Sequence, residues 1–246
     1  NRRILKGVSL LALMWLLPLA IGCKFQSDSP SVQVGDLQTE SQSVELGGAE
    51  SVRAELKMGV GTLKVTGGAT ELLEANFTYN VAEWKPEVKY DVTGGQGVLT
   101  VQQPGEARGS LQGNVRYEWD LRLNNTVPID LSVELGVGES QFSLGSLSLT
   151  RLNIEMGVGG ATVDMVGDWK RDLDACIEGG VGNLLLRLPR DIGVRVEVEQ
   201  GIGALHAGGL KKDGDVYVND AFGKSAVTLH IHIEAGIGGI QLELGE

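Results

Sequence analysis

The sequence predicts an all-β protein whose body is a β-solenoid with glycine corners, preceded by a smaller β domain. Two observations carry this prediction. Glycine, with 36 of 246 residues, is about twice as frequent as its usual ~7% share. Apolar and polar residues also alternate on both sides of recurring Gly-[Val/Ile]-Gly triplets. Alternation with a period of two is typical of half-buried strands, and a pattern that recurs at a fixed period indicates a solenoid.

Six triplets define the repeat. The first glycines at 136, 157, 180 and 201 lie 21, 23 and 21 residues apart. Glycine suits a corner because it adopts positive φ without a Cβ clash and lets neighbouring backbones approach closely. We expect the Val or Ile between the two glycines to point inward and fill the corner. The structural glycines are Gly59, Gly61, Gly136, Gly138, Gly157, Gly159, Gly180, Gly182, Gly201, Gly203, Gly236 and Gly238.

The residues around each triplet predict a buried and an exposed side for every strand. Residues three and five positions before the first glycine are apolar in all six repeats, so we expect them to face the core. Residues six positions before the first glycine mostly alternate between positive and negative charge from one repeat to the next. If the repeats stack in chain order, these residues would form cross-strand ion pairs. Two positions before the triplet stands a column that either is screened by water and salt or collects cations: Glu134, Glu155, Glu178, Glu199 and Glu234.

The first 22 residues are predicted to be a lipoprotein signal peptide. Three basic residues precede sixteen uncharged, mostly apolar ones, which is fewer than the ~20 that a spanning helix needs. The run Leu19-Ala20-Ile21-Gly22-Cys23 resembles the bacterial lipobox, so Cys23 is the expected lipidation site. An ordinary signal peptide with an incidental cysteine is the alternative. Residues 23–42, rich in Ser, Gln, Asp and Pro, are predicted to be a tether.

The remainder divides into an N-terminal β domain over 43–131 and the solenoid over 132–246. The first part has only one glycine triplet and holds most of the aromatic residues. Tyr117 and Trp119 share a strand face. A stacking platform for carbohydrate is one interpretation, and a place in the core is the favoured one. With Cys23 lipidated, Cys176 is expected to be a free thiol on an outward position.

Two stretches resemble a known family. VYVNDAFGKSAVTLHIHIEAGIG (216–238) resembles the C-terminal domain of LiaF-type, cell-wall-active-antibiotic response proteins, the toast-rack family. VELGGAESVRAELKMGVGTLKVTGG (44–68), with EWKPEVKYDV (83–92), resembles the N-terminal domain that accompanies it. The resemblance implies a right-handed parallel β-solenoid of stacked short sheets with no established catalytic residues. Some members regulate envelope-stress signalling, but those carry transmembrane helices where this chain has a predicted lipid anchor.

Few residues suggest catalysis or metal binding. His230, His232 and Glu234 lie at two-residue spacing on one strand face, a pattern that can chelate zinc or copper; a solvated polar face is the favoured interpretation. No Gly-x-Ser-x-Gly nucleophile elbow occurs. Glutamates on a flat face also lack the apolar pocket that raises the pKa of a catalytic acid. We therefore predict no enzyme, no catalytic residue and no cofactor.

Charge narrows the choice of partners. Without the signal peptide, eighteen basic and thirty-two acidic residues remain, a net charge of −14, which repels nucleic acid and anionic lipid headgroups. We expect a non-catalytic lipoprotein of the bacterial cell envelope, anchored in a membrane through Cys23 on the extracytoplasmic side. It would bind or scaffold an envelope protein, or sense stress. The alternative is a β-solenoid that binds cations or glycans at its surface.

Overall fold

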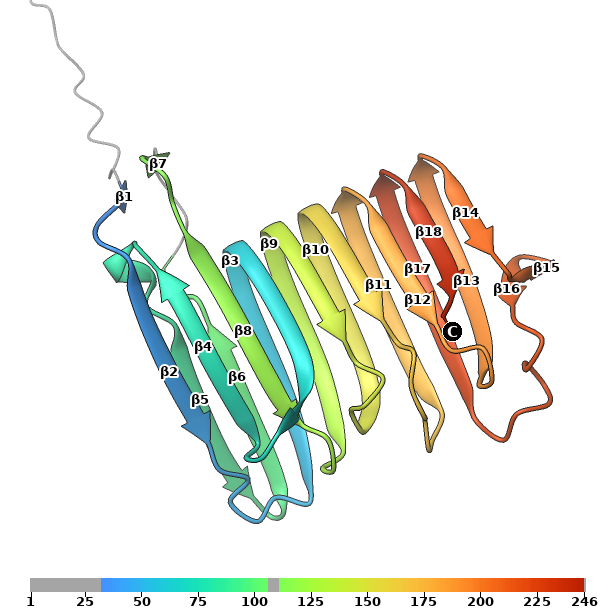
Figure 1. The fold of residues 1–246 in the computed structure, drawn as a ribbon, viewed down its shortest axis with the longest axis horizontal. Helices are drawn as coiled ribbons and strands as arrows, with labels where there is room; N and C mark the ends of the chain where they lie inside the picture. Colours follow the sequence, from blue (N-terminus) through green and yellow to red (C-terminus); the bar gives the residue numbers. More distant parts are fainter. Residues whose placement is uncertain (1–31, 106–110, 246) are drawn as a thin grey trace, which may run out of the picture.

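The protein is a rack of strands stacked side by side (Figure 1). The computed structural model describes residues 32–105 and 111–245, which form β-strands and one short 3-10 helix, η1 (Ala82–Trp84). The all-β prediction is therefore confirmed. Cys23 and the signal peptide lie outside the described residues, and the second half of the predicted tether contributes strand residues. In the part of the chain that the structure describes, no helix is long and apolar enough to cross a membrane.

Six rungs form the rack, and each glycine triplet lies where a strand of the first layer bends into a strand of the second. In three rungs the strand runs through the bend unbroken: β3 (Ser51–Ala69), β9 (Ile129–Ser143) and β10 (Leu149–Asp164). In the other three the bend separates two strands: β11 (Leu173–Val181) and β12 (Leu184–Leu188), β13 (Gly193–Ile202) and β14 (Leu205–Gly208), β17 (Thr228–Ile237) and β18 (Ile240–Leu244). Neighbouring rungs pair in parallel in both layers.

The rungs do not stack in chain order. The spatial order is β3, β9, β10, β11, β17, β13, so the last rung lies between two earlier ones. Stacking in chain order is therefore wrong for the last two repeats. The long connection over 209–227 lets the chain pass around β13 before β17 begins. It contains a hairpin of β15 (Lys211–Asp213) and β16 (Val216–Val218), which pairs antiparallel with part of the free edge of β13.

Further strands extend the rack beyond β3 at the N-terminal end. In the first layer these are β6 (Gln96–Gln102) and β5 (Glu87–Thr93), and in the second layer β8 (Tyr117–Asn124), β4 (Leu73–Tyr79) and β2 (Gln38–Val44). β1 (Val32–Gln33) and β7 (Leu111–Gln112) form a separate parallel pair.

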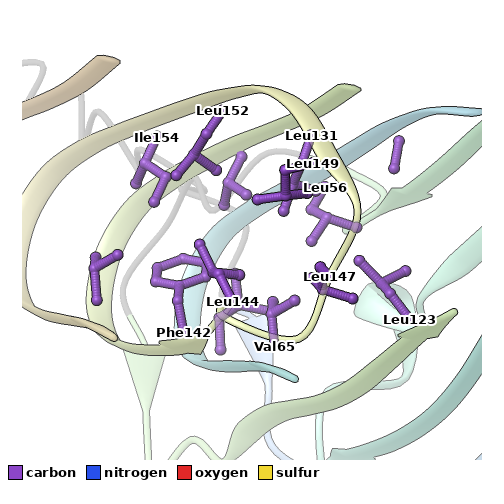
Figure 2. Close-up of a cluster of buried hydrophobic side chains, with 14 of the residues drawn as sticks. Leu56, Val65, Leu123, Leu131, Phe142, Leu144, Leu147, Leu149, Leu152 and Ile154 are labelled. Carbon is purple, nitrogen blue, oxygen red and sulfur yellow. The ribbon is translucent and has the colours of Figure 1, made fainter. Parts of the chain in front are cut away.

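The core fills the space between the two layers (Figure 2). Leu131 and Ile154 of the first layer face Phe142 and Val65 of the second, and all four are fully buried. The apolar positions before each triplet are buried as predicted, except Val198 in the end rung, which is half-buried. One cluster of buried side chains extends from the N-terminal strands to the last rung. The predicted boundary at residue 131 lies within β9, and the division into two domains stays a prediction.

The aromatic residues belong to the N-terminal part of this core. Tyr117 and Trp119 are 3% and 1% exposed. Trp119 packs edge-on against Phe77 with ring centroids 5.7 Å apart, and the Tyr117 hydroxyl donates to the Trp84 carbonyl at 2.7 Å. The core interpretation is confirmed, and these rings are not accessible to a sugar.

The two glycines of each triplet meet different constraints. The second glycine has φ between 141° and 155° in all six rungs, a region that L side chains rarely adopt. In five of them an added Cβ would also lie 1.5–1.7 Å from a carbonyl oxygen of the neighbouring rung. At the first glycine φ is not positive, but in the same five rungs a Cβ would lie 2.4–2.5 Å from a neighbouring carbonyl oxygen. A side chain at either position would push the rungs apart.

Candidate functional site on the outer face of the first layer

The outer face of the first layer carries three columns of polar side chains that run across all six rungs. Because the rungs pair in register, residues two, four and six positions before each triplet align with their counterparts on neighbouring strands. In spatial order, the column next to the bends is Lys57, Glu134, Glu155, Glu178, Glu234 and Glu199. The middle column is Glu55, Ser132, Asn153, Cys176, His232 and Glu197. The lower column is Arg53, Asp130, Arg151, Asp174, His230 and Arg195.

The five glutamates next to the bends, here called the glutamate column, are all exposed. Adjacent strands lie ~4.8 Å apart, so the five carboxylates extend over about 19 Å. Lys57 ends the column, with its Nζ 3.2 Å from Glu134 Oε1. That hydrogen bond raises the pKa of Lys57. Glu155, Glu178 and Glu199 have no cationic side chain within ion-pair distance among the described residues.

A row of aliphatic side chains runs beside the glutamate column along the bends. It consists of the residues between the two glycines, aligned in register: Val60, Val137, Val158, Val181, Ile237 and Ile202. We call this row the corner ridge. The last five are 47–70% exposed, so the expectation that these residues point inward is wrong. Strict alternation places them on the buried side, but the bend breaks the alternation and turns them outward at the junction of the two layers.

A groove runs along the glutamate column, and the corner ridge begins one residue beyond the glycines that line it. The groove has a volume of about 990 Å³ and crosses all six rungs. The first glycine of every triplet lines it, so the backbone is uncovered there, and the glutamates border it on the side away from the ridge. Lys57 and Gln103 lie at one end and Gln200 at the other. We call this feature the corner groove.

Glutamine side chains complete the hydrogen bonding at both ends of the row of bends. Gln103 Oε1 accepts from the backbone N–H groups of Gly59 at 2.9 Å and Val60 at 3.1 Å. At the opposite end, Gln200 Nε2 donates to the Gly238 carbonyl at 2.7 Å. Sequence reasoning missed both residues, because neither lies near its partner in the chain.

The lower column alternates in sign through Asp174 and then continues with His230 and Arg195, because β17 lies between β11 and β13. Arg53 and Asp130 form its one cross-strand ion pair within the described ranges, at 3.9 Å. In the middle column, Cys176 is a partly buried free thiol. Burial raises the pKa of this thiol, and the carboxylates of Glu178, Glu234 and Glu155 raise it further.

The histidines proposed as metal ligands lie on this face, but they do not converge. His230 belongs to the lower column and His232 to the middle one. His232 Nε2 lies 3.0 Å from Glu234 Oε1. Over residues 32–105 and 111–245, no group of three or more His, Cys, Asp or Glu side chains is placed to hold a metal ion.

Comparison with known proteins assigns the fold to a family. The family model for the N-terminal domain of toast_rack, DUF2154, matches residues 33–187, which is more than half of the chain. The chain belongs to the toast-rack family. A crystal structure of a candidate cell adhesion protein from Clostridium sporogenes is 38% identical to this toast-rack protein. The match covers 85% of this chain and 100% of that one, with a TM-score of 0.83.

More distant structures match over similar lengths. A candidate adhesin from Bacteroides fragilis is 11% identical to the toast-rack protein, over 86% of this chain and 99% of that one, with a TM-score of 0.29. A candidate lipid-binding protein from Parabacteroides distasonis is 9% identical, over 86% and 99%, with a TM-score of 0.28. A search of curated proteins finds no match.

Proposed function

We propose that this toast-rack protein is a non-catalytic binding module of the bacterial cell envelope, held at a membrane by a lipid on Cys23. It engages an envelope component through the outer face of its first layer. The right-handed winding of the solenoid and the extracytoplasmic location belong to the same proposal.

One observation carries the proposal: an aligned array of exposed carboxylates and aliphatic side chains crosses six rungs. Most exposed aliphatic residues on proteins are scattered singly, whereas contiguous ones mark interaction sites. The 38%-identical Clostridium sporogenes protein, itself a candidate for cell adhesion, supports a binding role. The short apolar signal and the lipobox-like Cys23 support the location.

A photo-crosslinking amino acid tests which face is used. We would place it at Asn153, in the middle column of the first layer, or at Thr162, which is equally half-exposed on the outer face of the second layer of the same rung. Irradiation of intact cells is expected to give a discrete adduct from position 153 only. Adducts from both positions, or from position 162 alone, would contradict the proposal.

Intact mass of the wild type and of Cys23→Ala tests the anchor, because only the wild type should carry a diacyl or triacyl adduct.

Cation binding by neighbouring pairs of carboxylates in the glutamate column is the second candidate function, since among the described residues no three side chains are placed to hold one ion. It is favoured by the three glutamates without a cationic partner among the described residues, since like charges about one strand spacing apart repel. Calorimetric titration with calcium should then give a heat of binding that Glu155→Gln with Glu178→Gln abolishes and Glu139→Gln leaves unchanged.

A further inference from the structure

We infer that the corner groove binds a basic amphipathic α-helix of a partner protein, lying across the six rungs at right angles to the strands. This inference rests on the proposed binding function and names the chemistry of the partner. It follows from the composition of the glutamate column that lines the groove and of the corner ridge beside it, and from the spacing at which both repeat.

The corner ridge, which adjoins the groove, is apolar and accessible. Among the described residues, eight large hydrophobic side chains are clearly exposed, and five of them are the ridge residues Val137, Val158, Val181, Ile202 and Ile237. Their alignment on adjacent strands makes them one continuous stripe. A partner that covers this stripe must present an apolar stripe of its own.

The glutamate column fixes the charge of the partner. Its five carboxylates line the groove, and among the described residues Lys57 is the cation at hydrogen-bond distance that offsets one of them. A second copy of this chain would bring its own glutamate column to the contact, and an anionic membrane would be repelled in the same way. A segment with Lys or Arg beside an apolar stripe complements both the column and the ridge.

The repeat distance selects a helix over an extended strand. Carboxylates and aliphatic side chains both recur every ~4.8 Å along the groove, so five of them extend over about 19 Å. Four turns of an α-helix advance about 22 Å. Five same-face residues of an extended peptide extend over about 27 Å. The helix therefore matches the repeat of the groove more closely than the extended peptide does. A helix of about 16 residues would cover all six rungs, about 24 Å.

The floor of the groove allows close approach at the glycines. The first glycine of each triplet lines it, and of the residues just before these glycines Gly179 and Ala235 are small, Met58 and Leu135 are buried, and Met156 and Gln200 are partly exposed. Small residues leave room for a helix, which is 10–12 Å wide with its side chains, to lie against the backbone between the glutamate column and the corner ridge.

The probe is a fluorescent 18-residue peptide of Leu and Lys with its apolar and basic stripes at helical period, compared with a peptide of the same composition in strict alternation. Fluorescence anisotropy measures binding, and circular dichroism measures the helicity of the bound peptide. We expect the helical-period peptide to bind and gain helicity.

The variant Glu155→Gln/Glu178→Gln/Glu234→Gln should weaken binding about tenfold or more and reduce its salt dependence, since three exposed ion pairs are lost. The variant Val158→Thr/Val181→Thr/Ile237→Thr should also weaken it about tenfold, because less apolar surface is covered.

The matched control is Glu118→Gln/Glu139→Gln/Glu243→Gln, which removes three carboxylates from the second layer and should leave binding unchanged. Equal loss in this control would show that only net charge matters and would overturn the inference. Equal or tighter binding of the alternating peptide would overturn it as well, and so would unchanged binding by the Val/Ile variant. Thermal unfolding of each variant excludes loss of fold as the cause. If the crosslinker at Asn153 still captures a partner while the helical peptide does not bind, the proposed function survives and this inference fails.

Discussion

The bends and the connections at the opposite edge of the rack are built on different principles. At the bends, every rung uses the same three residues, and backbone packing between glycines determines the geometry. At the opposite edge, the connections vary in length, and buried asparagine side chains hold two of them. Asn219, for example, is buried and donates to the carbonyls of Pro189, Arg190 and Ile192, while its Oδ1 accepts from Val194 N–H. Asn124 holds the carbonyls of residues 69–71 in the same way.

The two edges therefore differ in the role that we assign to them: the uniform edge carries the proposed binding groove, and the irregular edge determines the order of the rungs. The uniform edge presents the same chemistry every ~4.8 Å, which suits a partner that is itself periodic. The irregular edge determines where the chain goes next and therefore the order of the rungs. Variants at the two edges should consequently fail in different ways.

The largest effect is expected at the bends. In Gly182→Ala the new Cβ would lie 1.6 Å from the Gly159 carbonyl oxygen, at φ 153°, so we expect a loss of about 4 kcal/mol or more, or no folding. Gly179→Ala, three residues earlier, is the control: nothing lies within 4 Å of its Cβ. It should stabilise the protein by up to about 1 kcal/mol through the unfolded state. Urea denaturation measures both. Similar losses in the two variants would contradict the packing argument.

Removing a hydrogen-bonding side chain from the irregular edge should lower the free energy of unfolding by less. Asn219→Ala leaves three carbonyls and one N–H without their partner, and we expect a loss of about 2–4 kcal/mol in the free energy of unfolding. Asn153→Ala, which removes one side-chain hydrogen bond on an open face, should change it by no more than about 0.5 kcal/mol. Asn219→Ala at wild-type stability would mean that the 189–192 connection is held by other contacts.

The corner ridge should contribute little to folding. Val158 is 50% exposed, so Val158→Thr should change the free energy of unfolding by less than about 0.5 kcal/mol. Val163, in the same strand but fully buried, is the comparison: Val163→Thr buries a hydroxyl and should cost about 1–3 kcal/mol. A large loss in Val158→Thr would show that the ridge stabilises the fold and is not reserved for a partner.

The smallest effect concerns the reactivity of Cys176. Its raised pKa leaves less thiolate at pH 8 than an unperturbed cysteine has, so alkylation by iodoacetamide should be slow and should accelerate as the pH rises. Glu178→Gln removes one of the charges that raise the pKa and should accelerate alkylation several-fold at pH 8. Burial, the largest cause, remains. Glu139→Gln, on the other layer, should leave the rate unchanged, and an equal acceleration there would exclude a local carboxylate effect.

Much of the fold follows from local patterns in the sequence. Alternation around the triplets identified the strands and their buried sides, because side-chain direction in a strand is a local property. The order of the rungs could not be predicted. Val196 of β13 and Ile231 of β17 follow the same pattern, so the local sequence does not distinguish which of the two strands pairs with β11.

The arrangement of side chains on the outer face of the first layer was predicted in part. The glutamate column was visible as a repeated residue, and parallel register aligned it as the repeat suggested. The exposure of the corner ridge was missed because the alternation of buried and exposed residues along a strand was extended through the bend. The alternation does not hold there. Nothing local marks Gln103 as the residue that closes the row of bends, since its partner Gly59 lies 44 positions away.

The inserted position of β17 also ties the order of the rungs to a segment that is synthesised late. Synthesis delivers β13 before β17, yet β17 occupies the interior place between β11 and β13. Until residues 228–244 are available, the edge of β11 that β17 covers can pair with β13, which carries the same alternation. The native order of the rungs is therefore reached only after residues 228–244 have been synthesised. A chain that stops before Thr228 lacks an inner rung rather than an end rung, so residues 228–244 determine whether the rack assembles in its native order.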